Sequence, residues 1–292
     1  YIYATKVIAD GHYPLASDYR EIFLADNNTC KEIIWPLVQD GLRAQSSAGT
    51  NFYVKAFVNG PMDELYKTGV GSRGWGNVRA KVSLVDAFDA DDVMFDGNDT
   101  WGNNKKDKRA QFMTALPNQV KDTWDVNMDM TSTFTCGYGY IKWRNVTKED
   151  ELCPSGDAYT SIDFPLFRTA DAYLMAAEAI LRGANGTQSE ALGYVNEVRT
   201  RAYMSGKYAK NGVRSDVSGE IGANELDLDF LLLERQKELA SELIRRTDLI
   251  RFGKYTKGNN WDWKNGVRLG EDVDDKYNLF PIPESELTNN PT

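Results

Sequence analysis

A glycine-rich stretch, Gly69–Gly74, matches the phosphate-binding pattern G-x-G-x-x-G. In a dinucleotide-binding fold this pattern follows a strand, opens a helix and precedes an acidic residue on the next strand. Here Leu-Tyr-Lys-Thr precedes the stretch, Trp-Gly-Asn-Val follows it, and no such βαβ unit is recognisable. We therefore discard a nucleotide site. The pattern instead predicts a flexible loop that presents Arg73, Trp75 and Asn77.

Trp75 is the strongest candidate for a ligand contact. Gly74 and Gly76 flank it and leave it little to pack against locally. An exposed aromatic ring among polar neighbours can serve as a platform for a ligand. Aromatic residues make up 12% of the chain, with 7 Trp and 15 Tyr, and many stand beside Gly or Asn. For any single ring, burial in the core is the competing interpretation.

No catalytic constellation is recognisable. His12 is the one histidine of the chain, so a Ser-His-Asp or Cys-His arrangement would depend on this single residue in a loop-like context. No P-loop, H-E-x-x-H or G-x-S-x-G motif occurs. Carboxylates are abundant, but no pair stands out from the surface charge as a glycosidase pair would. We predict a binding protein that is not an enzyme, with no catalytic residue and no cofactor.

Metal and nucleic-acid sites are also disfavoured. The carboxylate-rich stretch Asp89–Asp99 lacks the spacing of an EF-hand loop, so a solvated acidic turn is favoured over a loose calcium site and no metal ligand is predicted. Cys30, Cys136 and Cys153 form no C-x-x-C pair, although one disulfide, such as Cys136 with Cys153, stays possible. The chain has 43 acidic and 34 basic residues, without the basic face of a nucleic-acid binder.

Long amphipathic helices dominate the second half of the chain. Glu225–Gly253 reads as one long helix, because leucines recur at helical spacing, no proline interrupts them, and the final glycine is a natural stop. Phe164–Gly183 is the predicted partner helix, with Asp163 as its N-cap. Thr187 and Glu190 fit a capping box for a further helix.

The first half is predicted to be more irregular. Ile2–Ile8 has helical character and ends at Gly11, a short strand is expected around Ile33–Leu37, and Asn51–Val58 alternates enough to form another. From Trp101 to Asp157 no long helical pattern is visible. An irregular region of this length often forms a binding surface.

Four blocks in one order resemble the SusD/RagB family, the outer-membrane nutrient-binding lipoproteins of Bacteroidetes. The blocks are FRTADAYLMAAEAI, YVNEVRTRAY, LLLERQKELASELIRRTDLIRFGKY and LFPIPESELTNNP. The resemblance implies a mainly α fold, in which tetratricopeptide-type helical hairpins carry an irregular, loop-rich subdomain with short strands. It implies one domain over 1–292, with a loop-rich part (1–160), helical hairpins (161–253) and a C-terminal wrap (254–292). Family members are usually longer, so we expect this chain to lack the N-terminal half.

The resemblance also implies a function. Family members capture glycans for a SusC-like TonB-dependent transporter at the outer membrane, where a lipid anchor that would lie outside this chain holds them at the cell surface. Carried over to this sequence, the family's binding surface includes the loops from Asn51 to Asn77. It makes Trp75 the stacking platform, Tyr53 a second ring, Arg73 and Asn77 polar contacts, and Trp101 a further candidate.

Three other interpretations stay open at this point. RagB-like relatives capture peptides in place of glycans, and a tetratricopeptide-type protein-interaction module would also account for the helices. A glycoside hydrolase would differ from all of these by turning over oligosaccharides.

Overall fold

The computed structural model describes most of the chain, in these ranges: 1–45, 47, 49–58, 63, 66–93, 105–113, 138–204 and 218–290. The chain divides into two compact units, Tyr1–Glu242 and Leu243–Thr292, and each is described by itself. The borders predicted at residues 160 and 253 stay predictions.

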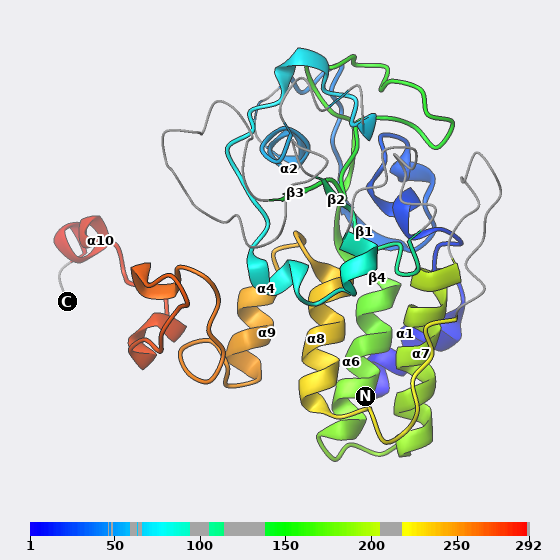
Figure 1. The fold of residues 1–292 in the computed structure, drawn as a ribbon, viewed down its shortest axis with the longest axis vertical. Coiled ribbons are helices and arrows are strands. Elements are labelled where there is room, and N and C mark those ends of the chain that lie inside the picture. Colours follow the sequence, from blue (N-terminus) through cyan, green and yellow to red (C-terminus); the bar gives the residue numbers. More distant parts are fainter. Residues whose placement is uncertain are drawn as a thin grey trace. The chain divides into compact units, whose positions relative to one another are not determined.

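The first unit is mainly helical in its described part (Figure 1), which confirms the predicted fold class. Its helices are α1 (Ile2–Asp10), α2 (Thr50–Lys55), α4 (Val82–Val85), α5 (Ala90–Val93), α6 (Thr169–Leu181), α7 (Gln188–Met204) and α8 (Leu228–Leu239). Its strands are β1 (Ile33–Leu37), β2 (Phe112–Met113), β3 (Gly139–Tyr140) and β4 (Phe164–Arg168). The strands form two small antiparallel pairs, β1 with β4 and β2 with β3.

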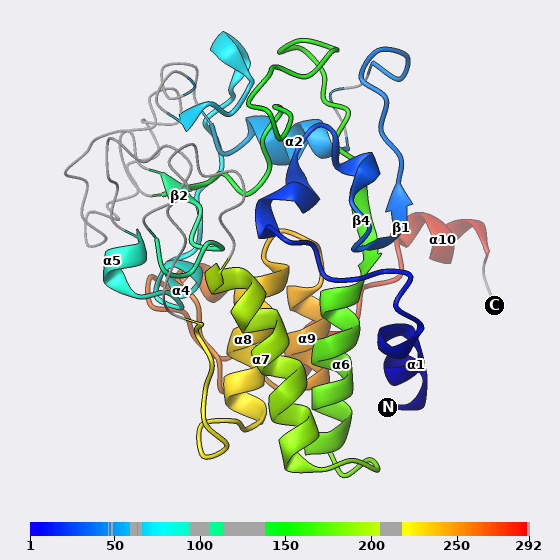
Figure 2. The same ribbon diagram turned by 90° about the vertical axis from the view of Figure 1, so that its right-hand side faces the viewer.

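Three helices, α6, α7 and α8, lie side by side, and α1 packs on α6 (Figures 1 and 2). Their buried residues recur at helical spacing: Ala170, Leu174 and Ala177 on α6, and Val195 and Val198 on α7. The small alanines let the axes approach closely. The predicted helical hairpins are thereby confirmed, and their packing is consistent with a tetratricopeptide-type arrangement.

Several local predictions are confirmed by backbone and side-chain geometry. Gly11 ends α1 with φ 68°, a left-handed conformation that glycine adopts without strain. The Thr187 backbone N–H donates to Glu190 Oε2 (2.7 Å) and the Glu190 N–H donates to Thr187 Oγ1 (3.2 Å), which forms the predicted capping box at the start of α7. The predicted strand at Ile33–Leu37 is β1.

The predicted long helix over Glu225–Gly253 is wrong, because it is two helices. α8 ends at Leu239, and the chain then turns through Ser241 (φ 61°) and Leu243 (φ 63°). The second unit begins within this turn, and α9 (Arg245–Arg251) follows it.

The break after α8 has a tertiary cause. Lys142 Nζ donates to the carbonyl oxygen of Ala240 (2.7 Å), and Arg168 Nε donates to Glu242 Oε2 (2.7 Å). These buried contacts hold the backbone in a turn, although the leucine spacing would allow the helix to continue. Helix propensity is a weak preference that tertiary contacts of this kind override.

The predicted helix start at Asp163 is also wrong. Phe164–Arg168 is strand β4, and α6 begins only at Thr169. β4 pairs with β1, and Pro36 lies opposite Pro165, where neither residue has an N–H to donate. Asp163 Oδ1 accepts a hydrogen bond from the Gln39 N–H (2.8 Å) instead of capping a helix.

The stretch Asn51–Val58, predicted as a strand, contains helix α2 instead. Thr50 and Val54, four residues apart, are both buried, which is the helical spacing. Thr50 Oγ1 also donates to the carbonyl oxygen of Ile162 (2.8 Å), a contact from a distant part of the chain. This contact could not be read from the local pattern.

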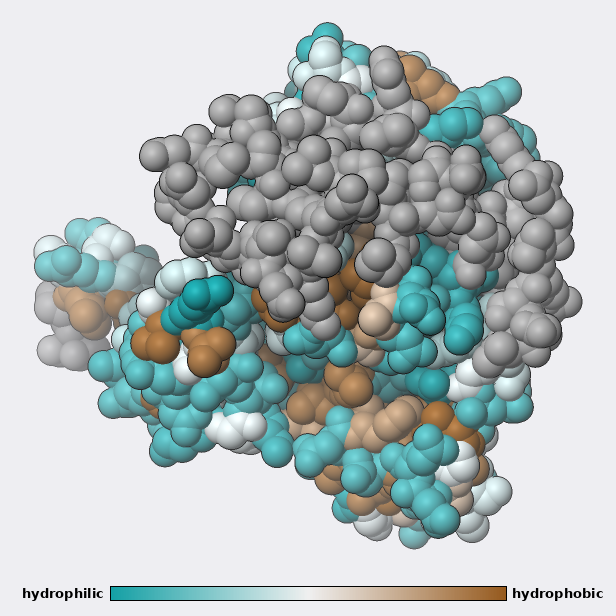
Figure 3. Space-filling view, in the orientation of Figure 1, coloured by the Kyte–Doolittle hydropathy of each residue, from teal (hydrophilic) through white to brown (hydrophobic). Residues whose placement is uncertain are grey.

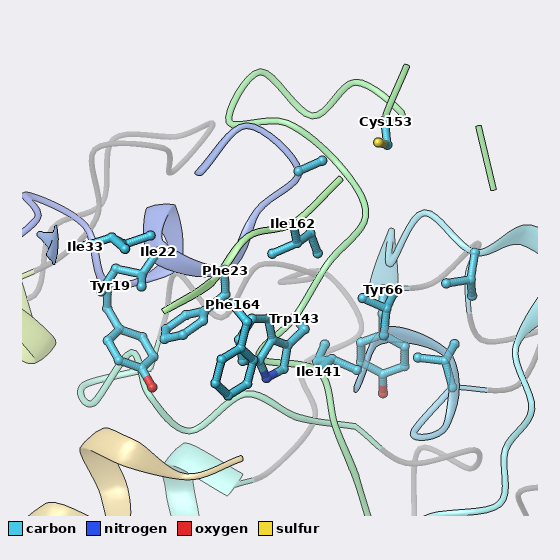
Figure 4. Packing of buried hydrophobic residues seen from close by; sticks show 14 of the residues in the cluster. Tyr19, Ile22, Phe23, Ile33, Tyr66, Ile141, Trp143, Cys153, Ile162 and Phe164 are labelled. Carbon is cyan, nitrogen blue, oxygen red and sulfur yellow. The ribbon is translucent and has the colours of Figure 1, made fainter. Parts of the chain in front are cut away.

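An aromatic core fixes the loop-rich part of the first unit (Figure 4). Trp143 is fully buried and stacks on Phe164, with centroids 5.5 Å apart and planes at 8°, while the edge of Phe23 meets it at 4.9 Å. Aromatic contacts of this kind add roughly 0.5–1.5 kcal/mol each beyond the burial of their area. The loops of this part therefore pack on a tightly packed aromatic core.

A cluster of buried ion pairs joins α7, α8 and β4 to the loops. Its members, which we call the buried ion cluster, are Glu32, Asp107, Arg109, Lys142, Arg168, Arg199, Arg201, Glu234, Glu238 and Glu242. The five acidic and five basic side chains balance in charge. Glu238 lies at the centre and contacts Arg109, Arg168 and Arg201. A buried charge is tolerated only when partners compensate it in this way.

The buried ion cluster predicts a loss of stability in acid. Burial alone would raise the pKa of Glu238, but Arg201, Arg168 and Arg109 outweigh it and hold that pKa well below the usual 4.5. The unfolded chain therefore binds a proton that the folded chain does not as the pH falls below about 4.5, and stability is lost in that window. We expect the urea midpoint to fall between pH 5 and pH 3, with a shallower fall in Glu238→Gln. An equal fall in both proteins would contradict this assignment.

The second unit contains α9, α10 (Glu284–Asn289) and short 3-10 turns. Gly253 (φ 67°) ends α9 as predicted. Asp248 pairs with Arg251 (2.6 Å) inside α9. Arg246 lies over the Phe280 ring, 4.1 Å from its centroid.

Apolar and hydrophilic residues share the surface of the first unit's helices (Figure 3). Met175 on α6 and Leu233 on α8 are among the exposed apolar residues. Single apolar side chains of this kind are common on protein surfaces and carry no functional meaning by themselves.

Candidate functional site

The loop Gly69–Asn77 is anchored to the end of α2 by its backbone. The N–H groups of Trp75, Gly76 and Asn77 donate to the carbonyl oxygens of Lys55 (2.8 Å), Val58 (2.7 Å) and Ala56 (3.0 Å). The last carbonyls of a helix have no partner inside the helix, so the loop supplies partners for Lys55 and the C-cap residue Ala56, while Val58 lies just beyond α2. The sequence predicted a flexible loop, and the structure shows one that is tied down where Trp75 lies.

The glycines of this loop serve close backbone packing. A Cβ at Gly69 (φ 75°) would lie 2.5 Å from the backbone oxygen of Asn145, and one at Gly71 (φ 52°) would lie 2.9 Å from Asp157 Oδ2. Only glycine fits such positions without a shift of the neighbouring atoms. The G-x-G-x-x-G pattern thus has a structural reason unrelated to phosphate binding.

Two aromatic rings are exposed together beside this anchor. Trp75 is 39% exposed and Phe52 of α2 is 44% exposed. Their centroids are 6.3 Å apart and their planes meet at 60°, an edge contact. The pair offers an apolar surface of two rings set at an angle, each able to meet a flat apolar face of a ligand.

Tyr53, next to Phe52 on α2, is half-buried. It stacks on Trp143 (5.3 Å between centroids) and approaches Phe164 (5.7 Å), and its ring meets the edge of Phe52 at 5.7 Å. Burial raises the pKa of the Tyr53 hydroxyl. Tyr53 connects the exposed rings to the aromatic core, so the platform has a rigid support.

Polar groups from a third segment complete the surface. Arg73 Nε donates to Asp157 Oδ1 at 3.0 Å. Lys55 Nζ donates to the carbonyl oxygen of Ala158 and lies 5.8 Å from the centroid of the Tyr159 ring. Burial lowers the pKa of Lys55, the charge of Arg73 lowers it further, and Asp157 opposes both. The segment from Asp157 to Tyr159 is thus fastened to α2 and to the loop.

The structure brings three of the five predicted site residues together at this surface. Arg73, Trp75 and Asn77 are all exposed on one loop. Tyr53 is half-buried and reaches this surface through its contact with Phe52. Trp101 lies outside the described residues.

Phe52 and Asp157 were missed by the sequence analysis. Phe52 neighbours Tyr53, and the strand predicted here would have placed the two rings on opposite faces. In helix α2 consecutive side chains are only about 100° apart, and the two rings meet with centroids 5.7 Å apart. Asp157 is 84 residues from Arg73, and no local signal joins them.

Among the residues considered for metal or redox chemistry, Asp92 has a structural role. Asp92 accepts hydrogen bonds from the Lys106 N–H (2.7 Å) and the Asp107 N–H (3.1 Å). Cys30 and Cys153 are free thiols, while Cys136 lies outside the described residues. In the part of the chain that the structure covers, no three His, Cys, Asp or Glu side chains gather as a metal site requires.

His12 lies on the surface, with Nδ1 2.9 Å from Asp10 Oδ2.

The described helices include none that is both long and apolar enough to span a membrane.

Known structures share this fold. A SusD superfamily protein from Parabacteroides distasonis superposes with a TM-score of 0.60 at 19% identity, over 99% of this chain and 54% of that protein. The surface glycan-binding protein A from Bacteroides thetaiotaomicron, solved in complex with laminarihexaose, gives a TM-score of 0.58 at 20% identity, over 99% of this chain and 56% of that protein.

Sequence comparison gives the family. The starch-binding protein SusD of Bacteroides thetaiotaomicron is 31% identical over 318 aligned positions, covering 99% of this chain and 53% of that protein. The chain thus spans about half the length of this curated relative. The family model described as the SusD family matches residues 31–292. The resemblance found in the sequence is confirmed, and the chain belongs to the SusD family.

Proposed function

We propose that this chain carries a glycan-binding surface of a cell-surface protein that captures oligosaccharides or polysaccharides. The captured glycan would pass to a partner SusC-like TonB-dependent transporter at the outer membrane, where a lipid anchor would hold the full-length protein. The protein acts by binding, and no bond of the glycan is made or broken. Support comes from the relatives, which include a starch-binding protein and a surface glycan-binding protein.

The observation that carries the proposal is the exposed ring pair Trp75–Phe52 on an anchored base, with Arg73 and Asn77 on the same loop. A sugar has flat C–H faces rimmed by hydroxyls. Aromatic rings cover the faces, while guanidinium and amide groups bond the hydroxyls. The ring pair and its polar neighbours supply both kinds of contact.

The energetics require these contacts to act together. An aromatic contact contributes roughly 1 kcal/mol beyond the burial of its area. Binding at an open surface must also offset the lost freedom of the ligand, at a cost of several kcal/mol. A preformed platform lowers that cost, because neither the loop nor the rings need to be ordered when the glycan arrives.

The test is a titration of the purified protein with neutral oligosaccharides, including maltohexaose and laminarihexaose, and with a matched panel of peptides. Tryptophan fluorescence and calorimetry are recorded in parallel. Trp75 is exposed and its emission should change on stacking, whereas Trp143 is buried in the core and should not respond. We expect saturable binding with one class of glycan, and the response should disappear in Trp75→Phe if Trp75 is its source.

The outcomes separate the alternatives. Saturable binding of peptides without binding of any glycan would overturn the proposal in favour of peptide capture. Release of shorter sugars during the titration, followed by chromatography, would overturn the assignment as a binding protein.

A further inference from the structure

The Arg73 guanidinium is held through its Nε, while its two terminal nitrogens are not held in this way by any residue that the structure describes. Its Nε donates to Asp157 Oδ1 at 3.0 Å, and both side chains are partly exposed. Among the described residues, no hydrogen bond engages the two terminal nitrogens of Arg73. A guanidinium is a planar fork, so fixing Nε also fixes the direction in which the terminal N–H groups point.

Asp157 is itself fixed against the loop. Its Oδ2 lies 2.9 Å from the place that a Cβ on Gly71 would occupy, so the carboxylate packs closely on the loop backbone. The Lys55 bond to the carbonyl oxygen of Ala158 holds the adjoining residue to α2. Asp157 therefore links Arg73 to a segment that is hydrogen-bonded to α2, although the two residues are far apart in the sequence.

Two other cationic side chains of this region, Lys55 and Arg79, donate hydrogen bonds to main-chain oxygens. Lys55 is only 7% exposed and donates to a main-chain oxygen. Arg79 Nη1 donates to the carbonyl oxygen of Gly76 at 2.7 Å. Arg73 is the cation on the loop between Gly69 and Asn77, beside Trp75, and its charge is paired with Asp157.

We infer that Asp157 is the positioning residue of this surface, holding Arg73 so that its terminal N–H groups donate to neighbouring hydroxyls of an uncharged sugar stacked on Trp75. The inference rests on the proposed function and adds a ligand class to it. A sugar carboxylate bound to the same guanidinium would lie beside Asp157, well inside the screening length of about 8 Å at physiological salt. The net charge of −9 adds to this repulsion. The surface thus selects neutral glycans over acidic ones.

The experiment uses calorimetry with a neutral oligosaccharide that the protein binds and with the same oligosaccharide oxidised at C6 to uronates. The wild-type protein should bind the neutral form about 10-fold more tightly or better. Asp157→Asn removes the carboxylate that would repel a uronate. The ratio of the affinity for the neutral sugar to that for the oxidised sugar should therefore fall about 10-fold. The control is Asp40→Asn, which alters another exposed Asp–Arg pair, with Arg43 at 3.8 Å, and should leave the ratio unchanged.

Arg73→Lys is a second variant, which keeps the positive charge but loses the planar pair of terminal N–H donors. It should weaken binding of the neutral sugar about as much as Arg73→Ala does, because a single ammonium cannot reproduce a fixed pair of donors. Thermal melting of each variant confirms that the fold is intact.

An unchanged ratio in Asp157→Asn, or tighter binding of the oxidised sugar by the wild-type protein, would overturn the inference and leave the proposed function standing. Failure of both sugar forms to bind the folded wild-type protein would overturn the proposed function itself.

Discussion

Replacing Glu238 by glutamine should destabilise the protein by about 4 kcal/mol, the largest effect we expect from a single substitution. Glu238 is fully buried, and its two oxygens contact Arg168 (2.6 Å), Arg109 (3.2 Å) and Arg201. Glutamine keeps the size of the side chain but removes its negative charge. The buried ion cluster is then left with one uncompensated positive charge in a region that water cannot reach.

The measurement is urea unfolding followed by circular dichroism, for which the midpoint should fall with little change in slope. Glu149→Gln is the control, because Glu149 is exposed, and it should change stability by less than about 0.5 kcal/mol. A loss below about 1 kcal/mol for Glu238→Gln would show that the cluster tolerates an unpaired charge. It would also remove the basis of the acid prediction.

Replacing Trp75 by alanine should weaken glycan binding by about 2 kcal/mol, or roughly 30-fold in Kd. The estimate combines the apolar area that the sugar would cover with the additional stacking term. The attachment of the loop should persist, because Trp75 is held through its backbone N–H, which alanine keeps. The measurement is calorimetric titration with the oligosaccharide identified in the panel.

Trp35→Ala is the matched control for this prediction. Trp35 is 64% exposed, more than Trp75, but stands on β1, where its ring meets the edge of Phe167. It should leave the affinity unchanged. Equal losses in both variants would mean that exposed tryptophans in general, and not the surface at Trp75, account for binding. No loss at Trp75 would place the glycan elsewhere.

Much of the helical part of the fold could be predicted from the sequence, because its signals are local. Gly11 and Gly253 end helices through a backbone conformation that favours glycine. Thr187 and Glu190 form the start of α7 from residues three positions apart. Patterns of this kind depend only on residues close together in the sequence, so the sequence is sufficient to predict these helix ends.

The errors occur where distant residues decide the backbone. The turn after α8 is held by Lys142 and Arg168, which come from other parts of the chain. Helix α2 depends on Thr50 reaching Ile162. Leucine spacing or alternation cannot reveal such contacts, and in both places the local pattern favoured the wrong element.

The candidate site divides in the same way. Arg73, Trp75 and Asn77 could be grouped from the sequence because they lie on one loop, and glycines on both sides suggested that the ring was exposed. Phe52 depended on the correct assignment of α2. Asp157 depended on a loop that returns to Arg73 from 84 residues away, and only the structure could place it there.

The way the loop is attached has a consequence for how its specificity can change. Trp75, Gly76 and Asn77 are fastened to α2 through their main-chain N–H groups, which every residue except proline possesses. The side chains at positions 73, 75 and 77 can therefore be exchanged without loss of the attachment. A library randomised at these three positions, on an unchanged scaffold, would be a direct route to binders of other sugars. Natural divergence of ligand preference could follow the same route.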